Sequence, residues 1–149
     1  MNADAPPAGP VPELAVGAVA TRGHELLLVR RGHGPAAGSW SVPGGRVHFG
    51  EDLREAVVRE LAEETGLEGV VSSFLGWVER IGDEGGAPYH FVILDFVVDV
   101  LDATVPVAGD DADEAAWIPF DELADLRLAE GLDDFLREHG VLTDDEIEL

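Results

Sequence analysis

The sequence predicts a single α/β sandwich domain, and three observations lead to this expectation. Apolar runs of strand length lie on both sides of residues 52–65, where apolar positions instead recur with the period of a helix. Two more helical stretches follow the last strand-like run. With 149 residues, 46% of them hydrophobic, the chain can fill one ordinary core. Strands with helices between and after them pack as layers of helix and sheet.

The elements follow from local patterns, taken in chain order. Residues 1–12, rich in Ala, Pro and Gly, have little to bury and are expected to form a disordered tail. Apolar runs at 14–21 and 25–31 around Arg22-Gly23 are typical of a hairpin. The next expected elements are a loop at 32–38, a strand at 40–42, a turn at 43–45, a helix at 52–65, strands at 70–80 and 89–101 joined by the turn GDEGGAP, a strand at 117–120, and helices at 121–126 and 129–139. The folded domain is expected to span 13–140, with 141–149 as an acidic C-terminal tail.

Composition narrows the function classes. A net charge of −22 argues against nucleic acid and anionic membranes as partners, because both need a basic surface. The absence of cysteine, of a long apolar run and of a basic-then-apolar leader makes a reducing cytoplasm the expected location. A small phosphorylated substrate remains compatible with this charge if metal ions and arginines at the site neutralise its phosphates. All nine basic residues are arginines, which suits bidentate phosphate recognition, although codon bias explains the pattern equally well. Whether the chain forms a homodimer stays open.

The helix at 52–65 ends in crowded like charges. Asp52 followed by Glu55 predicts an N-terminal capping box, and Gly66 predicts the C-terminal stop. An apolar stripe along the helix continues into Glu60, with Glu63 and Glu64 on either side of it. Each like-charge pair costs a few tenths of a kcal/mol, and the negative end of the helix dipole adds to this cost. The cluster therefore suggests a hard divalent cation, Mg²⁺ or Mn²⁺; a solvated acidic helix end is the simpler interpretation.

The spacing of the whole segment resembles a known signature. It consists of Gly45, five residues, Glu51, seven residues, Arg59-Glu60-Leu61, one residue, Glu63-Glu64, one residue, and Gly66-Leu67. This pattern resembles the Nudix box, complete at every defined position. The approach SWSVPGGRVHFGE and the downstream segments YHFVILDFVVDV and GDDADEAAWIPFDEL are similar to the bacterial ADP-ribose pyrophosphatase-like subgroup. The resemblance implies an α/β/α sandwich with a mixed sheet, and a metal-dependent hydrolase that cleaves the pyrophosphate of a nucleoside diphosphate derivative.

The resemblance also implies roles for individual residues. The expected metal ligands are Glu60 and Glu64, with Glu63 as a further ligand or a base, and the backbone carbonyl of Gly44. Arg59 is expected to orient Glu51, although a plain surface salt bridge would show the same spacing. Glu114 resembles a general base supplied from a later loop, with surface acidity as the equally weighted alternative. The remaining expected site residues are Arg30, Arg31 and Arg46 for the substrate, and Gly45 and Gly66 for the backbone shape of the box.

One position departs from the subgroup. His48 stands where a glutamate is usual, which removes one potential ligand; we expect it simply to cover the loop. His90, at the start of an apolar strand, is expected to be a core or rim residue. The subgroup resemblance favours ADP-ribose as substrate. A pyrophosphatase for oxidised or non-standard nucleoside triphosphates is the second hypothesis, and a nucleotide-sensing domain without turnover is the third. The complete set of glutamates argues against the sensor.

Overall fold

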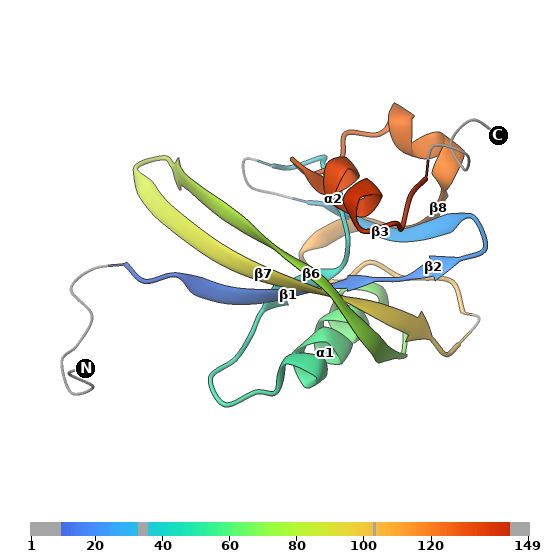
Figure 1. Cartoon of the computed structure of the whole chain (residues 1–149), viewed down its shortest axis with the longest axis horizontal. Coiled ribbons are helices and arrows are strands. Elements are labelled where there is room, and N and C mark those ends of the chain that lie inside the picture. Colours follow the sequence, from blue (N-terminus) through green and yellow to red (C-terminus); the bar gives the residue numbers. More distant parts are fainter. Residues whose placement is uncertain (1–9, 33–35, 103, 144–149) are drawn as a thin grey trace.

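The computed structural model describes residues 10–32, 36–102 and 104–143, which form two four-stranded sheets with helices around them (Figure 1). In chain order the elements are β1 (Glu13–Val19), β2 (Thr21–Arg22), β3 (Glu25–Arg31), β4 (Trp40–Ser41), β5 (Gly44–Arg46), α1 (Leu53–Thr65), β6 (Gly69–Glu84), β7 (Ala87–Val100), β8 (Ala112–Pro119), the 3₁₀ helix η1 (Phe120–Asp125) and α2 (Leu132–Glu138). None of the described helices has both the length and the apolar composition that a membrane-spanning segment requires.

The predicted fold class is confirmed. The first sheet has the order β5-β1-β7-β6 and is mixed, because β1 and β7 run parallel while the other pairs are antiparallel. The second sheet is antiparallel, with the order β2-β3-β4 and β8 paired to β3. In Figure 1, α1 and α2 lie on opposite sides of the strands, which gives the α/β/α sandwich its two outer layers.

α1 forms where the local signals predict it. The side chain of Asp52 accepts hydrogen bonds from the backbone N–H groups of Arg54 (2.9 Å) and Glu55 (3.4 Å), so it caps the helix. Gly66 ends the helix in the left-handed region at φ 73°, and its N–H bonds the carbonyl of Ala62. One face of α1 is buried in the first of two cores. This first core contains Val16, Ala18, Ala20, Leu27, Ala56, Val57, Leu61, Leu67, Phe96 and Val98.

The second core lies between the second sheet and the C-terminal elements. It contains Val19, Leu26, Leu28, Trp40, Phe120, Leu123, Leu132, Phe135, Leu136 and Leu142. Each fully buried side chain of this size contributes about 1.5–3 kcal/mol to the free energy of unfolding. Because the last of these residues belongs to the predicted 141–149 tail, the tail boundary needs correction: the packed domain continues through Leu142. Residues 1–9 and 144–149 of the two predicted tails, and 33–35 of the predicted 32–38 loop, lie outside the described residues.

The strands of the second half are longer than predicted. β6 and β7 continue toward each other until only Gly85-Gly86 separates them, in place of the expected seven-residue turn GDEGGAP. Both glycines have positive φ (59° and 88°), so a tight turn is available and the polar residues beside it can pair across the hairpin. β8 likewise begins at Ala112, because residues 112–116 pair with β3.

Other local expectations also need correction. Residues 14–21 do not form a simple hairpin with 25–31, since β1 lies in the first sheet and Thr21–Arg22 alone pairs with β3 as a strand. The expected turn at 43–45 contains the start of β5, which pairs with β1. The predicted helix at 129–139 begins at Leu132, because Gly131 has φ 79° and cannot continue a helix. The predicted helix at 121–126 is the 3₁₀ helix η1.

The first sheet also contains a buried carboxylate that no sequence pattern singled out. Asp95 of β7 is paired with Gly17 on one side and Gly76 on the other, and is 4% exposed. A Cβ atom at Gly17 would collide with Asp95 Oδ1, so the carboxylate lies directly over that glycine. Among the described residues Oδ1 has no hydrogen-bond partner. Burial raises the pKa of Asp95 to about 7, and the charge of Arg80 opposes this shift only in part.

Asp95→Asn is expected to stabilise the protein at pH 8 by about 2 kcal/mol or more, and much less at pH 5. The folded-state pKa of Asp95 lies above the ordinary value of 3.8, so the wild type loses stability as pH rises from about 4 to about 7. Asparagine does not ionise and avoids this loss. Urea denaturation at both pH values measures the difference. Asp99→Asn, an exposed position of the same strand, is the control, and an equal effect of Asp95→Asn at both pH values would contradict the assignment.

Candidate active site

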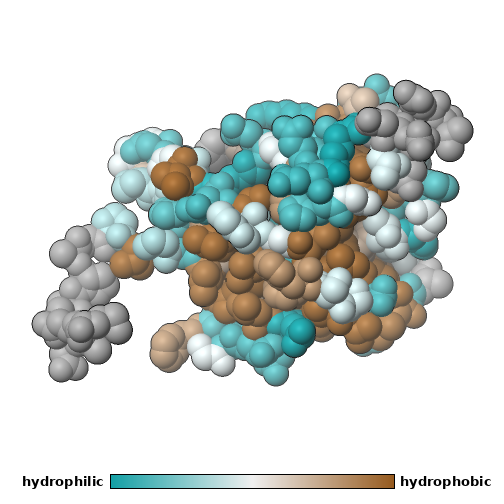
Figure 2. All heavy atoms as spheres, in the orientation of Figure 1, coloured by the Kyte–Doolittle hydropathy of each residue, from teal (hydrophilic) through white to brown (hydrophobic). Residues whose placement is uncertain are grey.

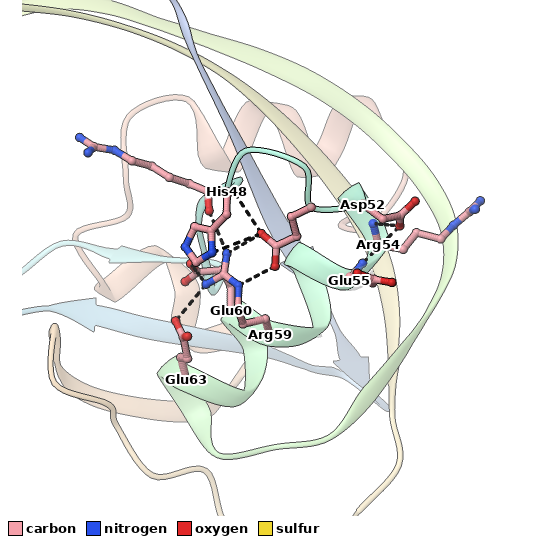
Figure 3. A network of polar contacts seen from close by, with 9 residues as sticks. His48, Asp52, Arg54, Glu55, Arg59, Glu60 and Glu63 are labelled. Atoms are coloured by element: carbon pink, nitrogen blue, oxygen red, sulfur yellow. Dashed lines mark hydrogen bonds and ion pairs between the residues drawn. The ribbon is translucent and has the colours of Figure 1, made fainter.

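Arg59 is the centre of the polar network on α1 (Figure 3). Its guanidinium holds Glu51 through two hydrogen bonds, Nε to Oε2 (2.7 Å) and Nη2 to Oε1 (2.9 Å). Nη1 donates to Glu60 (2.7 Å) and Glu63 (3.1 Å), and Nη2 also donates to the backbone carbonyl of Arg46 (3.0 Å). The side chains of Arg59 and Glu51 are mostly buried, so this is no plain surface salt bridge. Arg59 therefore ties the loop before α1 to Glu60 and Glu63, two of the three glutamates at the end of the helix.

The network stabilises the charged forms of its members. Hydrogen bonds from the Arg59 side chain and from the His48 backbone N–H lower the pKa of Glu51 to about 2. The same pairing with Glu51 raises the pKa of Arg59 above its ordinary range. His48 itself contributes through its N–H (3.0 Å to Glu51), while its ring is mostly exposed, in keeping with a covering role. Glu51 and Arg59 consequently stay ionised over the whole range of physiological pH.

Glu64 has a different environment from the other two glutamates of the cluster. It is half-buried, and its Oε2 accepts a hydrogen bond from the backbone N–H of Gly44 (3.3 Å). Desolvation raises the pKa of Glu64 to about 7; the charges of Glu60 and Asp111 add to the rise, and the Gly44 bond and Arg31 oppose it. Glu64 is thus a partly desolvated carboxylate among other acidic groups, a position that a bound cation would relieve.

Two adjacent glycines let β5 lie close to both of its neighbours. A Cβ atom at Gly45 would come within 2.5 Å of the Glu60 carboxyl carbon, and one at Gly44 would clash with the carbonyl oxygen of Val16. β5 therefore reaches the acidic face of α1 because Gly45 lacks a side chain, and it lies against β1 because Gly44 lacks one. This brings the main chain at Gly44 and Gly45 beside Glu64 and Glu60, and the ligand role expected for the Gly44 carbonyl stays a prediction.

The segment after β7 closes the C-terminal end of α1. The N–H of Val107 donates to the Thr65 carbonyl (2.8 Å), and the N–H of Gly109 donates to the Glu64 carbonyl (3.1 Å). These donors satisfy carbonyls that a helix end leaves unpaired and offset its negative dipole. Asp111 follows two residues later, which explains how it comes to act on Glu64. Sequence reasoning missed Asp111; the acidic run DDADE was noticed, but its register against α1 depends on pairing between β8 and β3.

Glu114 lies in β8, not in a loop. It stands opposite Arg30 of β3, and the two side chains, both exposed, form a loose ion pair of 3.7 Å. Arg31 is close enough to Glu64 for its charge to act on it, whereas Arg46 is exposed, pairs with Glu13 (3.4 Å) and lies over the Phe91 ring. His90 pairs with Glu79 (2.9 Å) at the rim of the sheet. The structure thus brings Arg31 to the glutamates and leaves Glu114 paired with Arg30; the roles predicted for these residues stay predictions.

The donor chemistry of the site fits a hard divalent cation. Carboxylates and a closely approaching backbone are the oxygen ligands that Mg²⁺ takes, and Glu64 carries the charge repulsion that such an ion offsets. Within the described part of the chain, however, no three acidic or histidine side chains converge as a ready metal cage. Glu60 and Glu63 turn to Arg59 while Glu64 turns to Gly44. The structure supplies suitable donors and keeps two of them paired with an arginine.

A family model named NUDIX domain matches residues 11–139, nearly all of the described chain. The chain belongs to the NUDIX domain family. The resemblance of the box segment to this family is therefore confirmed.

Relatives and solved structures agree with this family. The chain is 38% identical over 116 residues to an ADP-ribose pyrophosphatase of Methanocaldococcus jannaschii, covering 77% of this chain and 66% of that protein. It is 42% identical over 73 residues to a putative 8-oxo-dGTP diphosphatase 2 of Mycobacterium tuberculosis, covering 48% of this chain and 50% of that protein. The chain thus spans less than two thirds of the length of these relatives. A MutT NUDIX hydrolase structure from Burkholderia pseudomallei superposes with a TM-score of 0.76 at 28% identity, covering 87% and 98% of the two chains.

Proposed function

We propose that this NUDIX domain hydrolyses the pyrophosphate of a nucleoside diphosphate derivative, with ADP-ribose as substrate and AMP and ribose 5-phosphate as products. The observation that carries the proposal is the half-buried Glu64, held by the Gly44 N–H beside the charges of Glu60 and Asp111. A carboxylate kept in such surroundings has a functional purpose more often than a structural one. The match to the ADP-ribose pyrophosphatase of Methanocaldococcus jannaschii supports the substrate.

The glutamates and the backbone of β5 form the proposed metal site. Glu60, Glu63, Glu64 and the Gly44 carbonyl would hold Mg²⁺ or Mn²⁺. When bound, such an ion neutralises phosphate oxygens and lowers the pKa of coordinated water. Arg59 competes for Glu60 and Glu63 and, through Glu51 and the Arg46 carbonyl, keeps their helix against the loop. This arrangement holds two carboxylates in place until the substrate arrives.

The reaction needs a proton acceptor and counter-charges for the phosphates. Attack of water at phosphorus releases a proton, which a carboxylate within reach can accept as the phosphate leaves. Glu63, the most exposed glutamate of the cluster, and Glu114 are the candidates for this acceptor. Arg31, whose charge reaches Glu64, is the best placed of the three candidate arginines to contact the pyrophosphate, since Arg30 and Arg46 are each paired with a glutamate.

Glu114→Gln is expected to lower kcat far more than it changes KM if Glu114 is the base, because metal and arginines hold the substrate. Raising the pH should then recover part of the rate, since hydroxide replaces the missing base. A metal-ligand role would instead give partial rescue by a higher Mg²⁺ concentration. Rates measured against both pH and Mg²⁺ separate these results. Unchanged kinetics in both titrations would leave Glu114 as the partner of Arg30 alone.

A second candidate function is supported by the alignment to the putative 8-oxo-dGTP diphosphatase 2 of Mycobacterium tuberculosis, over 73 residues. That activity on oxidised nucleoside triphosphates would use the same glutamates and release a nucleoside monophosphate and inorganic pyrophosphate. The two candidate activities share the same chemistry at phosphorus and differ in the group that leaves with the second product, ribose 5-phosphate or inorganic pyrophosphate. Their products therefore distinguish them.

The test compares substrates on the purified protein. Incubation with millimolar Mg²⁺ and either ADP-ribose or 8-oxo-dGTP, followed by chromatography of the products, should yield AMP and ribose 5-phosphate from ADP-ribose at the higher kcat/KM. Faster release of pyrophosphate from 8-oxo-dGTP would favour the second candidate. Full activity in excess EDTA would refute the metal-dependent chemistry. Binding of ADP-ribose without any turnover would make the domain a sensor.

A further inference from the structure

The first sheet has an apolar area that α1 leaves uncovered. α1 packs against the beginning of β6, where the Leu61 side chain lies over Gly69. Farther along the same strand, Phe74, Trp77 and Ile81 are 51%, 59% and 69% exposed. Solvent therefore meets three large apolar side chains on one long strand, far more than the scattered single residues that are normal on a protein surface.

The strand register places these side chains on one face. Phe74 stands opposite Phe96, Trp77 opposite Leu94 and Ile81 opposite His90. Phe96 belongs to the core under α1, so the row lies on the α1 side of the sheet. Leu14 of β1, half exposed, pairs with Val92 on the same face. Figure 2 shows a continuous hydrophobic area where β6 and β7 cross in front of α1. We call the residues Leu14, Phe74, Trp77, Ile81, Val92 and Leu94 the sheet patch.

The size of the sheet patch suits an interface. At about 200 Å² for a fully exposed aromatic side chain and somewhat less for the aliphatic ones, the patch exposes roughly 500 Å². This lies within the ~300–600 Å² of the largest apolar patch on a typical monomer, a patch that is often functional. With the ~60% apolar share that interfaces have, a core of this area corresponds to about 800 Å² per partner, the size of a standard stable interface.

The charge of the molecule decides which occupant fits. The polar residues on this face, Glu79 and His90, hydrogen-bond each other at 2.9 Å, and none of the six residues of the sheet patch carries a charge. The whole chain has a net charge of −22, which repels anionic membranes and nucleic acid. Two copies of the chain repel as well, yet they can meet where charge is absent. A surface that is apolar, locally neutral and close to the area of a dimer interface fits its own copy.

We propose that the sheet patch is the interface of a homodimer in which two copies pack their first sheets face to face about a two-fold axis. Such an interface is isologous, so one patch suffices to close the assembly. Two irregularities in the β6 register, at Val71/Ser73 and Phe74/Gly76, disfavour a continuous edge-to-edge β6 pairing and leave face packing as the contact. The proposal is independent of the substrate and of the metal.

Sedimentation equilibrium of the full chain between 0.1 and 50 µM, chosen to bracket the roughly micromolar affinity of a standard interface, tests the dimer. We expect twice the chain mass in the upper part of this range. We also expect tighter association at 0.5 M than at 0.05 M NaCl, because salt screens the repulsion between two acidic copies. A basic partner bound to the same face would show the opposite salt dependence. A monomer mass at every protein and salt concentration would overturn the proposal.

Trp77→Asp places a charge at the centre of the sheet patch and is expected to raise the dimer Kd by about 30-fold or more. Ile81→Asp provides a second, independent variant, and both positions are exposed enough for the monomer to keep its melting temperature in dilute solution. The matched control is Val70→Asp. Val70 is 47% exposed on the same strand, but its partner Asp99 places it on the opposite face. A dimer that survives both patch variants, or one that Val70→Asp disrupts equally, contradicts this interface.

Discussion

Glu64→Gln is expected to lower kcat by about 10³-fold while the fold persists. Arg59 bonds to Glu60 and Glu63 of the cluster, whereas Glu64 accepts a hydrogen bond from the Gly44 N–H and faces the charges of Glu60 and Asp111. Glutamine can still accept the bond from Gly44, so the shape of the site is kept. It lacks the negative charge that binds the proposed cation. Steady-state kinetics at saturating Mg²⁺ measure the loss.

Glu55→Gln is the matched control for Glu64. Glu55 lies in the first turn of the same helix, is exposed, and points away from the network around Arg59 (Figure 3). Its replacement removes one favourable interaction with the helix dipole, a few tenths of a kcal/mol, and should leave kcat within about twofold. Thermal unfolding without metal should show that Glu64→Gln is at least as stable as the wild type, because a desolvated charge has been removed. Similar losses of kcat in both variants would mean that the assignment of the catalytic face is wrong.

Arg59→Lys is expected to lower kcat by about 10–100-fold and to lower the melting temperature. A lysine ammonium cannot reproduce the two parallel bonds to Glu51 while also reaching Glu60, Glu63 and the Arg46 carbonyl. Glu51 would lose the partner that holds its pKa near 2, and the loop before α1 would lose its attachment to the helix. The effect should therefore appear in both activity and stability, unlike that of Glu64→Gln.

Arg54→Lys controls for the loss of an arginine from α1, since Arg54 is exposed and points away from the network (Figure 3). Circular dichroism melting curves and kcat should both be close to the wild type. An Arg59→Lys variant with wild-type kcat would show that the pairing with Glu60 and Glu63 has no consequence for turnover. A loss of kcat that recovers in excess Mg²⁺ would instead indicate that Arg59 acts by keeping the glutamates ready for the metal.

The sequence predicted α1 well because its signals are local. The Asp52 cap, the buried Ala56 and Val57 and the stop at Gly66 all lie within one helix length. The ends of β6, β7 and β8 were predicted too short, because strand length depends on pairing with distant segments whose partners composition does not reveal. The polar residues near Gly85-Gly86 had the composition of a loop, yet they pair across a tight turn.

The residues of the candidate site also divide into those that local spacing predicts and those that long-range contacts place. Glu51, Arg59 and Glu60 lie within ten residues, so the box spacing was enough to expect them together. Asp111 reaches Glu64 through the pairing of β8 with β3 and the closure of α1 by Gly109, two long-range contacts. Glu114 was chosen from the same acidic run, but the strand register sets it opposite Arg30. The buried position of Asp95 likewise required the order of β1, β7 and β6.

The closure of α1 by Val107 and Gly109 bears on how this chain can be altered over evolution or by design. Gly109 lies so close to the Glu63 carbonyl that a Cβ atom there would clash, so Gly109 cannot gain a side chain, and the segment 107–109 cannot lengthen, without shifting the end of the helix. Val105, two residues earlier, is 81% exposed. Insertions before Val107 can therefore change which substrates the domain prefers and still leave the arrangement of glutamates intact. One or two extra residues after Val107 would instead separate Asp111 from Glu64.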